Sequence, residues 1–360
     1  MKVAHLINSM FTGGAENLIT ESISVFESNS FSVDVILLNG TETPFLNKLK
    51  QTNCKIILLS KSSVYNPFLV FKIIPLLKKY DIIHVHLFPA LYWVAIAKLI
   101  SFSKIKLVFT EHGTSNRRMN NKFFAPIDNF IYSFYSKIIT ISDDVDSSIK
   151  KALNTSESKF ELIKNGINID TIKKATPYID GKFSKNFCEK FLFQFSSFQY
   201  PKDQVTLIKS LLHLPQNVHL FLVGDGVLRT ECEALVKTLN LQNRVYFLGI
   251  RMDIPNLLKT ADIVVLSSHH EGLSLASIEG LASGKPFICS NVPGLREVVL
   301  GAGLLFEDKN EIQLSEQIIS LLESELYYNQ TVEKCLKRAA EFDIEIMVNK
   351  EIELYKSLVS

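Results

Sequence analysis

The sequence predicts an α/β protein built from two doubly wound, Rossmann-like domains in tandem. Short β-branched runs alternate with longer amphipathic segments, which is the pattern of buried parallel strands separated by helices. The alternation stops in a polar stretch at residues 154–186, which we expect to contain the linker, and then starts again. A length of 360 residues suits two domains of ordinary size.

The first half carries six expected strands. They are VAHLIN (3–8), VDVILL (33–38), KIILLS (55–60), DIIHVHL (81–87), KLVFTEHG (106–113) and KIITIS (137–142). Amphipathic segments such as 15–27 and 66–80 lie between them and predict helices. Pro75 is expected to kink or divide the second of these helices, because proline removes a backbone donor from the helix interior.

The second half repeats the pattern. Its expected strands are FLFQFSSF (191–198), VHLFLVGDG (218–226), RVYFLG (244–249), DIVVLSS (262–268), PFICS (286–290) and GLLFE (303–307). From residue 310 onward the pattern predicts helices only. Ligands of doubly wound sheets bind beyond the carboxyl ends of the strands, so candidate site residues are sought there.

Composition narrows the class of protein. Hydrophobic residues make up 47% and charged residues 21%, as in an ordinary soluble globular protein. The N-terminus lacks the features of a signal peptide, and the apolar stretch 90–100 is too short to span a bilayer and contains Lys98. Five scattered cysteines without a C-x-x-C pair favour a reducing cytoplasm over a zinc or disulfide framework.

The two halves differ in charge. Residues 1–180 hold 21 Lys and Arg against 15 Asp and Glu, and the remainder holds 18 against 22. A basic half suggests an anionic partner, such as a membrane surface or a phosphate-bearing substrate, although chance variation is an equal alternative. No basic helix or aromatic–basic RNA motif is present, so nucleic acid is not expected as a partner.

Polar and glycine residues follow two strands of the first half. Gly13 and Gly14 would let the backbone approach a ligand at the start of a helix, whose free N–H groups attract anions. The segment lacks the G-x-G-x-x-G fingerprint of dinucleotide folds, which disfavours an NAD oxidoreductase. His112 ends the fifth strand and is expected at the same edge of the sheet.

Two acidic or histidine pairs raise the question of a metal. His84 and His86 share one face of a strand, but no further ligands accompany them. Asp144 and Asp146 form an acidic triplet like that of metal-dependent sugar transferases, yet they stand at a helix start, where acids act as capping charges. We therefore expect no metal site.

In the second half, Lys202 lies at the mouth of the helix after the first strand, well placed to neutralise a phosphate. Gly224 belongs to a strand-to-helix turn, VGDG, that allows close backbone approach.

The stretch HHEGLSLASIEGLASGKP (269–286) holds two glutamates eight positions apart. Glu271 and Gly272 form a turn, and a helix is expected to begin near Ser274, so the N–H groups of about Leu273 to Ser277 are free to bind a ligand. Side chains lean toward the helix N-terminus, so Glu279 overlies Leu275 and points to the same site. A carboxylate accepts bonds from two adjacent hydroxyls, as a ribose offers, and Glu271 suits sugar hydroxyls better than phosphates.

These residues resemble the signature of the retaining GT-B glycosyltransferases of family four, E-G-[LF]-x-L-x-x-x-E. Other segments are similar to the family's motifs in order and spacing: TGGAE (12–16), TEHG (110–113), IKNGIN (163–168), LVGDG (222–226), VYFLG (245–249), ASGKPFICSNVPGLREVV (282–299) and the terminal helix from 342. The resemblance extends over nearly the whole chain.

The resemblance implies a fold and a division into domains. It implies two Rossmann-like domains facing a central crevice, with residues 1–168 binding the acceptor and residues 169–342 binding a nucleotide sugar. The C-terminal helix, about 343–360, would cross back to the first domain. Asn168 replaces the usual aspartate of the interdomain segment, a minor departure.

The resemblance also implies roles for the site residues. Glu279 would hold the ribose, Glu271 and His112 would contact the donor sugar, and Lys202 with the helix N-terminus would hold the diphosphate. Gly14 would approach the diphosphate from the other domain, and Gly13, Gly224 and Gly272 complete the expected donor site. Transfer would retain the anomeric configuration and need neither a metal nor a cofactor, since a lysine and free amides stabilise the leaving phosphate.

One departure bears on activity. Ser197 stands where the family usually carries an arginine that partners the lysine, and Arg251 or Arg296 would have to compensate. We expect a cytoplasmic glycosyltransferase that uses a nucleotide sugar, with UDP as the expected nucleotide, and a glycan or lipid-linked acceptor in the synthesis of a cell-surface polysaccharide. The alternatives are a non-catalytic partner subunit and an epimerase or phosphorylase on the same architecture.

A peripheral membrane contact is expected at NRRMNNKFF (116–124). Arg117, Arg118 and Lys122 lie beside two phenylalanines, a combination suited to anionic headgroups and the membrane interface. A solvated loop whose phenylalanines pack inward is the equal alternative.

Overall fold

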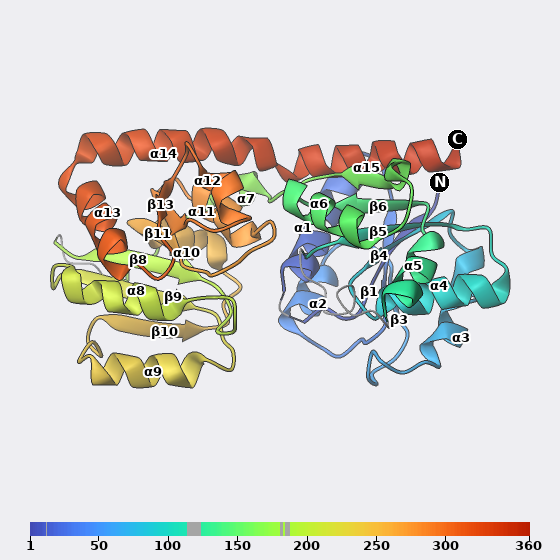
Figure 1. Cartoon of the computed structure of the whole chain (residues 1–360), viewed down its shortest axis with the longest axis horizontal. Helices are drawn as coiled ribbons and strands as arrows, with labels where there is room; N and C mark the ends of the chain where they lie inside the picture. Colours follow the sequence, from blue (N-terminus) through green and yellow to red (C-terminus); the bar gives the residue numbers. More distant parts are fainter. Residues whose placement is uncertain (12, 114–123, 181–182, 184–187) are drawn as a thin grey trace. The chain divides into compact units, whose positions relative to one another are not determined.

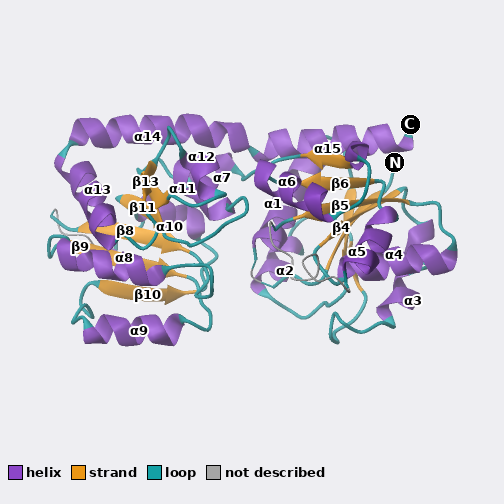
Figure 2. Cartoon of the chain, viewed as in Figure 1, coloured by secondary structure: helices purple, strands orange, loops and turns teal. Residues whose placement is uncertain are grey.

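The computed structural model describes residues 1–11, 13–113, 124–180, 183 and 188–360 (Figure 1). The chain divides into two compact units. Unit 1 comprises Met1–Gly166 together with Ile344–Ser360, and unit 2 comprises Ile167–Asp343. Each unit is built on a parallel sheet covered by helices, which confirms the predicted fold class (Figure 2).

Unit 1 contains a seven-stranded sheet in the order β3-β2-β1-β4-β5-β6-β7. Its strands are β1 (Val3–Ile7), β2 (Val33–Leu37), β3 (Ile56–Leu58), β4 (Ile82–His86), β5 (Lys106–Glu111), β6 (Lys137–Thr140) and β7 (Phe160–Leu162). All neighbouring strands run parallel. The chain winds outward from β1 in one direction and then from β4 in the other, so the strand order reverses between β1 and β4.

The helices of unit 1 cover both faces of this sheet. They are α1 (Gly14–Ser28), α2 (Pro44–Leu49), α3 (Leu69–Ile73), α4 (Ala90–Ser101), α5 (Ala125–Ser133), α6 (Asp143–Ala152) and α15 (Ile344–Val359), with 3-10 turns at Leu76–Lys78 and Glu157–Lys159. Helices α3, α4 and α5 contribute to a core on one face, and α1 packs against α15 and α2. The C-terminal helix α15 therefore belongs to unit 1, as expected.

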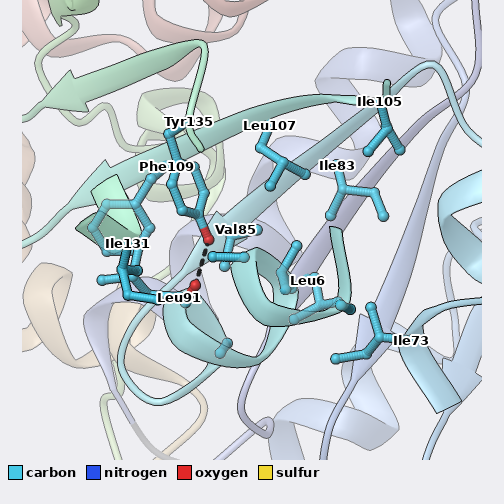
Figure 3. Close-up of a cluster of buried hydrophobic side chains, with 14 of the residues drawn as sticks. Leu6, Ile73, Ile83, Val85, Leu91, Ile105, Leu107, Phe109, Ile131 and Tyr135 are labelled. Atoms are coloured by element: carbon cyan, nitrogen blue, oxygen red, sulfur yellow. Dashed lines mark hydrogen bonds between the residues drawn. The ribbon is translucent and has the colours of Figure 1, made fainter. Parts of the chain in front are cut away.

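Strand alternation separates an apolar face of the unit 1 sheet from a polar one. Leu6, Ile83 and Val85 point into the core beneath α3, α4 and α5, together with Leu107 (Figure 3). The buried hydroxyl of Tyr135 donates a hydrogen bond to the Leu91 carbonyl at 2.7 Å within this core. The intervening strand residues face the opposite side, and three of them are histidines.

Unit 2 repeats the topology with six strands in the order β10-β9-β8-β11-β12-β13. They are β8 (Lys190–Phe195), β9 (Val218–Val223), β10 (Val245–Gly249), β11 (Ile263–Leu266), β12 (Phe287–Ser290) and β13 (Leu304–Phe306). Their pairs are parallel, and the strand order reverses between β8 and β11. This reversal is the point at which doubly wound sheets bind ligands.

Two groups of helices cover the unit 2 sheet (Figure 2). The first group, α8 (Gln204–Ser210), α9 (Arg229–Thr238) and α13 (Glu311–Glu323), packs into one core. The second is α7 (Ile169–Lys174), α10 (Ile254–Thr260), α11 (Leu275–Ala282), α12 (Leu295–Val299) and α14 (Glu325–Ala339), with 3-10 turns at Leu211–His213 and Ala340–Phe342. Within this group α11 packs against α7, α12 and α14.

The structure agrees with the sequence at every expected strand and adds one that was not expected. The extra strand is β7, which lies in the polar stretch 154–186. Pro75 divides the predicted helix at 66–80 into α3 and the following 3-10 turn, as expected. No helix among the described residues is long and apolar enough to cross a bilayer.

Candidate active site

In unit 2, the candidate site lies where the strand order reverses, on the loops that follow β8 and β11. The peptide groups of the two loops are joined: Lys202 forms an antiparallel bridge with Ser268, and the His269 N–H donates to the Pro201 carbonyl at 2.9 Å. Asp203 then caps α8 by accepting a bond from the Thr206 N–H at 3.1 Å. These bonds hold Lys202 at a defined position beyond the strand ends.

Lys202 and Glu271 meet in this position. The Lys202 Nζ donates a hydrogen bond to Oε1 of Glu271, and the two side chains are only 16% and 11% exposed. A partly buried ion pair of this kind fixes the geometry of both side chains, because little water competes for their contact. The structure thus brings together two residues that the sequence assigned separately, 69 positions apart.

The turn at Glu271 and Gly272 rests against a second turn. Gly294 adopts a left-handed backbone, with a φ of +81°, and a Cβ atom there would lie 2.1 Å from the Gly272 carbonyl oxygen and 2.3 Å from that of Glu271. Only glycine fits both the conformation and the space. Gly294 was not predicted as a site residue, although the Pro293-Gly294 pair is a turn signal in the sequence.

Helix α11 begins directly after this turn. Ser274 is its N-cap and Leu275 its first residue, as the sequence predicted. The first N–H groups of a helix lack intrahelical acceptors and carry partial positive charge, so they favour an anion. Glu279, one turn into the helix, is half-buried between the buried residues Ile278 and Gly280.

Gly224 has a packing explanation. It has a φ of +134°, and a Cβ atom there would lie 2.1 Å from the carbonyl oxygen of Ser196. The loop after β9 therefore packs directly on the loop after β8. This close approach accounts for the glycine, and its contact with a donor stays a prediction.

Ser197, which stands where the family usually carries an arginine, is fixed through its backbone carbonyl. The Ser197 carbonyl accepts a hydrogen bond from the Gln204 side-chain amide at 3.0 Å. Of the two arginines considered as substitutes, Arg251 is paired with Asp253, whose carboxylate it contacts at 2.8 and 2.5 Å. Arg296, in α12, is exposed and has no partner among the described residues, so it is the one whose guanidinium is available.

In unit 1, the first strand leads into the glycine pair as predicted. Gly13 is the N-cap of α1, and Gly14 is its first residue. The carboxylate of Glu16 folds back onto this turn, since a Cβ atom on Gly13 would lie 2.3 Å from its Oε2. Burial raises the pKa of Glu16 to about 7.

His112 follows β5 and is half-buried, next to the buried His86. The His86 Nδ1 and the His112 Nε2 are 3.2 Å apart and share a hydrogen bond. Burial lowers the pKa of His112 to about 4 and that of His86 well below the usual range, so both imidazoles are neutral. The Nδ1 of His112 has no hydrogen-bond partner among the described residues.

The groups considered for metal binding have structural partners. Asp144 and Asp146 lie in the first turn of α6, which Ser142 caps, so they are placed as capping charges. His84 and His86 share a sheet face with His5, and their ring nitrogens lie within 4.8 Å of one another. Each ring nitrogen of these three histidines already has a protein hydrogen-bond partner.

The membrane segment predicted at 116–124 lies outside the described residues except for Phe124, which is exposed.

Two family models match the chain. The model described as Glycosyltransferase Family 4 matches residues 12–171, and the model described as Glycosyl transferases group 1 matches residues 179–341. Together they cover nearly the whole chain, one on each half.

Curated relatives resemble the chain along most of its length. The N-acetylgalactosamine-N,N'-diacetylbacillosaminyl-diphospho-undecaprenol 4-alpha-N-acetylgalactosaminyltransferase of Campylobacter jejuni is 27% identical over 95% of this chain and 96% of that protein. The UDP-Gal:alpha-D-GlcNAc-diphosphoundecaprenol alpha-1,3-galactosyltransferase of Escherichia coli is 25% identical over 82% and 80%.

Solved structures share the fold. Anabaena HepE, crystallised in complex with UDP-glucose, superposes with a TM-score of 0.85 at 23% identity, over 99% of this chain and 100% of that one. WaaG, a glycosyltransferase involved in lipopolysaccharide biosynthesis, superposes with a TM-score of 0.74 at 17% identity, over 98% and 99%.

Proposed function

The chain belongs to the GT-B glycosyltransferases, and from this premise we propose that it transfers a sugar from a UDP-linked donor to a lipid-linked acceptor during cell-surface polysaccharide synthesis. One observation carries the proposal: the Lys202–Glu271 pair stands at the N-terminus of α11, where the unit 2 strand order reverses. The Campylobacter and Escherichia relatives supply the acceptor class, since both act on diphospho-undecaprenol-linked sugars.

Different site residues bind different parts of the donor. Lys202 and the N–H groups of Leu273, Ser274 and Leu275 bind the diphosphate, because they offer one full and several partial positive charges in one place. Glu271 is held by the lysine and turned to the hydroxyls of the donor sugar.

The remaining roles follow the family resemblance. Glu279 accepts bonds from the ribose hydroxyls, and His112 donates to the donor sugar. Gly13, Gly14, Gly224 and Gly272 let backbone approach the donor closely.

The reaction develops negative charge on the leaving diphosphate. A positioned lysine and helix amides stabilise that charge without reorganising, and such preorganised electrostatic stabilisation supplies much of the rate enhancement in many enzymes. Retention fits this arrangement, because the acceptor attacks from the side that the leaving group vacates and the departing phosphate takes its proton. We infer that no metal and no cofactor take part. Transfer is expected to persist in excess EDTA, and loss with rescue by Mg²⁺ or Mn²⁺ would contradict the inference.

Ser197 favours one alternative, a non-catalytic partner subunit, because a lost bidentate phosphate ligand weakens leaving-group stabilisation. Nucleotide release measured with and without acceptor separates the two functions. An active enzyme releases UDP in proportion to acceptor, and Arg296→Gln is expected to lower that rate if Arg296 replaces the missing arginine. A partner subunit releases none.

Working on a lipid-linked acceptor calls for contact with the membrane, and unit 1 carries an exposed aromatic surface that suits it. We define this aromatic surface as Tyr65, Phe68, Phe71, Phe88, Phe124, Ile127 and Phe130, which are between 38 and 69% exposed. The rings of Phe68 and Phe71 lie 6.4 Å apart, and exposed apolar side chains that adjoin one another mark interaction sites.

Helix α4 contacts both parts of the aromatic surface: the part before it in the sequence, from Tyr65 to Phe88, and the part after it, from Phe124 to Phe130. At its N-terminal end, the Trp93 indole donates to the Val64 carbonyl at 2.8 Å, and the rings of Tyr65 and Phe88 lie 6.0 Å apart. The Tyr92 hydroxyl donates to Asp128 of α5. Loops at the carboxyl ends of β3 and β4 therefore bring part of this surface to the edge where doubly wound sheets bind ligands.

Exposed lysines accompany the aromatic residues, including Lys61 and Lys72. Aromatic side chains beside cations match the interface of an anionic bilayer, which for this acceptor is the cytoplasmic leaflet. We therefore propose peripheral contact through the aromatic surface.

Co-sedimentation with phosphatidylglycerol vesicles tests this contact. Phe68→Ser with Phe71→Ser is expected to lower binding several-fold, because both rings leave the interface. Ile179→Ser with Val227→Ser is the matched control, since these unit 2 side chains are 82% and 83% exposed. An equal loss in the control, or no binding by the parent protein, would contradict the proposal.

A further inference from the structure

A continuous chain of hydrogen bonds runs from the buried core of unit 1 to His112. It starts at the Thr110 hydroxyl, 2.6 Å from Nε2 of His84, whose Nδ1 lies 2.6 Å from the Tyr355 hydroxyl. That hydroxyl lies 3.3 Å from Nε2 of His5.

The chain continues through two more contacts. His5 Nδ1 lies 3.0 Å from His86 Nε2, and His86 Nδ1 lies 3.2 Å from His112 Nε2. Each internal member is therefore bonded through both of its polar ends.

The residues of this hydrogen-bond chain come from four elements of unit 1. His5 on β1 is paired in register with His84 on β4, and His86 follows two residues later on the same sheet face. Thr110 is the β5 partner of His86. Tyr355 reaches the same face from α15, and every member except His112 is no more than 4% exposed.

The chemistry of imidazole links the proton positions along the chain. A neutral histidine carries one N–H, so a ring that accepts at one nitrogen must donate at the other. The Tyr355 hydroxyl has a single proton and sits between His84 and His5. Its orientation therefore determines which nitrogen is protonated in His5, in His86 and finally in His112.

The Thr110 hydroxyl decides between the two arrangements. If Tyr355 donates to His5, then Thr110 donates to His84, and every proton in the chain has an acceptor up to His112. If Tyr355 donates to His84 instead, His84 donates to Thr110, whose own buried proton then has no acceptor among the described residues. A buried donor without an acceptor is destabilising, so the first arrangement is favoured.

We propose that Tyr355 is a positioning residue that holds His112 in the Nδ1-protonated form, with that N–H presented as a hydrogen-bond donor to an oxygen atom of the bound substrate. The assignment rests on the proposed function for its catalytic meaning, because His112 is expected to contact the donor sugar. In the favoured arrangement His5, His84, His86 and His112 all carry their proton on Nδ1.

Nitrogen-15 NMR of the histidine rings of the full-length protein tests the proton positions. The signals of Nδ1–H and Nε2–H imidazoles differ, and His5, His84, His86 and His112 can be assigned by single His→Gln variants. The parent protein is expected to show the Nδ1–H pattern at all four. Tyr355→Phe removes the donor to His5, so His112 is expected to shift toward the Nε2–H pattern.

Tyr135→Phe is the matched control. It also removes one hydroxyl from a fully buried tyrosine of unit 1, but that hydroxyl bonds the Leu91 carbonyl and no histidine. In the Tyr135→Phe variant, the nitrogen-15 signals of the His112 ring are expected to equal those of the parent protein. In transfer assays Tyr355→Phe is expected to lower kcat by roughly two- to tenfold, the effect of one impaired hydrogen bond, and Tyr135→Phe is not.

The outcomes separate the proposal from the proposed function. A parent protein with His112 protonated on Nε2, a Tyr355→Phe variant with unchanged His112 signals, or stoichiometric zinc on the histidines would overturn the positioning role. The ring signals could instead change as expected while sugar transfer is unaffected, or while the parent protein shows no transfer at all. Either result would support the positioning role of Tyr355 and reject the role of His112 in transfer.

Discussion

At the scale of single residues, the Lys202–Glu271 ion pair is expected to contribute both to the stability of the fold and to binding of the donor. Lys202→Met or Glu271→Gln alone leaves the other group partly buried without its partner, so each is expected to lower the free energy of unfolding. Their combination is expected to recover about 1–3 kcal/mol as a coupling energy. Urea unfolding of the four proteins measures it, and additive losses would contradict the pair.

Activity is expected to follow a different rule at the same two positions. The double variant lacks the cation that neutralises the diphosphate, so it is expected to remain inactive although its stability recovers. Transfer by the double variant at the parent rate would show that the pair is structural only.

Glu351 is expected to make the stability of the protein depend on pH. Burial raises the pKa of this α15 carboxyl to about 8, and its Oε2 has no partner among the described residues. Between the unfolded value, 4.5, and about 8, the folded state holds a proton that the unfolded state has lost, so its stability falls as pH rises.

Glu351→Gln is expected to remove this dependence. From pH 6.5 to 8.5 the parent is expected to lose about 2 kcal/mol more than the variant. Urea unfolding at the two pH values measures the difference, which isolates Glu351 from Glu16 and the histidines. Parallel losses in the two proteins would show that Glu351 is already charged in the fold.

Some site residues can be predicted from the sequence and others cannot, for physical reasons. Lys202 and Glu271 could be predicted because each follows a strand, and strand ends of one parallel sheet share an edge. Tyr355 could not, since its partner His5 is 350 positions away and only the docking of α15 brings them together. Gly294 carried a turn signal, but its contact with Gly272 depends on tertiary packing.

At the scale of elements, the turn before α11 depends on the turn before α12. Gly294→Ala would place a methyl group against the Gly272 and Glu271 carbonyl oxygens and displace the turn that carries Glu271. Transfer is expected to fall by at least tenfold, because a shift of about 1 Å in a positioning group has large effects.

Gly301→Ala is the control for Gly294→Ala. Gly301 has nearly the same φ, +80°, but nothing lies within 4 Å of its Cβ position. It shares the conformational strain, about 1 kcal/mol or more, without the clash. The control is expected to lose stability and keep its activity, and an equal loss of transfer in both variants would refute the packing argument.

The central strands, such as β1, β4 and β11, were predictable because they are buried on both faces and read as continuous apolar runs. Strand β7 was not predicted, because it has three residues, only one of them buried, inside a polar segment. Its place is set by pairing with β6, which no local pattern reveals.

At the scale of the whole molecule, the two units share one plan. In both sheets the central pair of strands, β1 with β4 and β8 with β11, marks the reversal of strand order, and the candidate residues follow those strands or the next one. The repetition was visible in the sequence as a pattern that stops and restarts. The terminal helix could be assigned to the first unit only through the family resemblance, because its own sequence does not say where it docks.

Sugar transfer from a nucleotide donor to a lipid-linked acceptor is the activity that we propose for this protein. The direct measurement is release of UDP from a panel of UDP-sugars, with and without a diphospho-undecaprenol-linked sugar, by the parent protein and by Glu271→Gln. We expect one donor to release UDP only when acceptor is present, with the product carrying the new sugar, and at least roughly a hundredfold loss in the variant, as is typical when an essential polar group of an active site is removed. Acceptor-dependent release that is equal in the two proteins, or no release from any UDP-sugar, would contradict this activity.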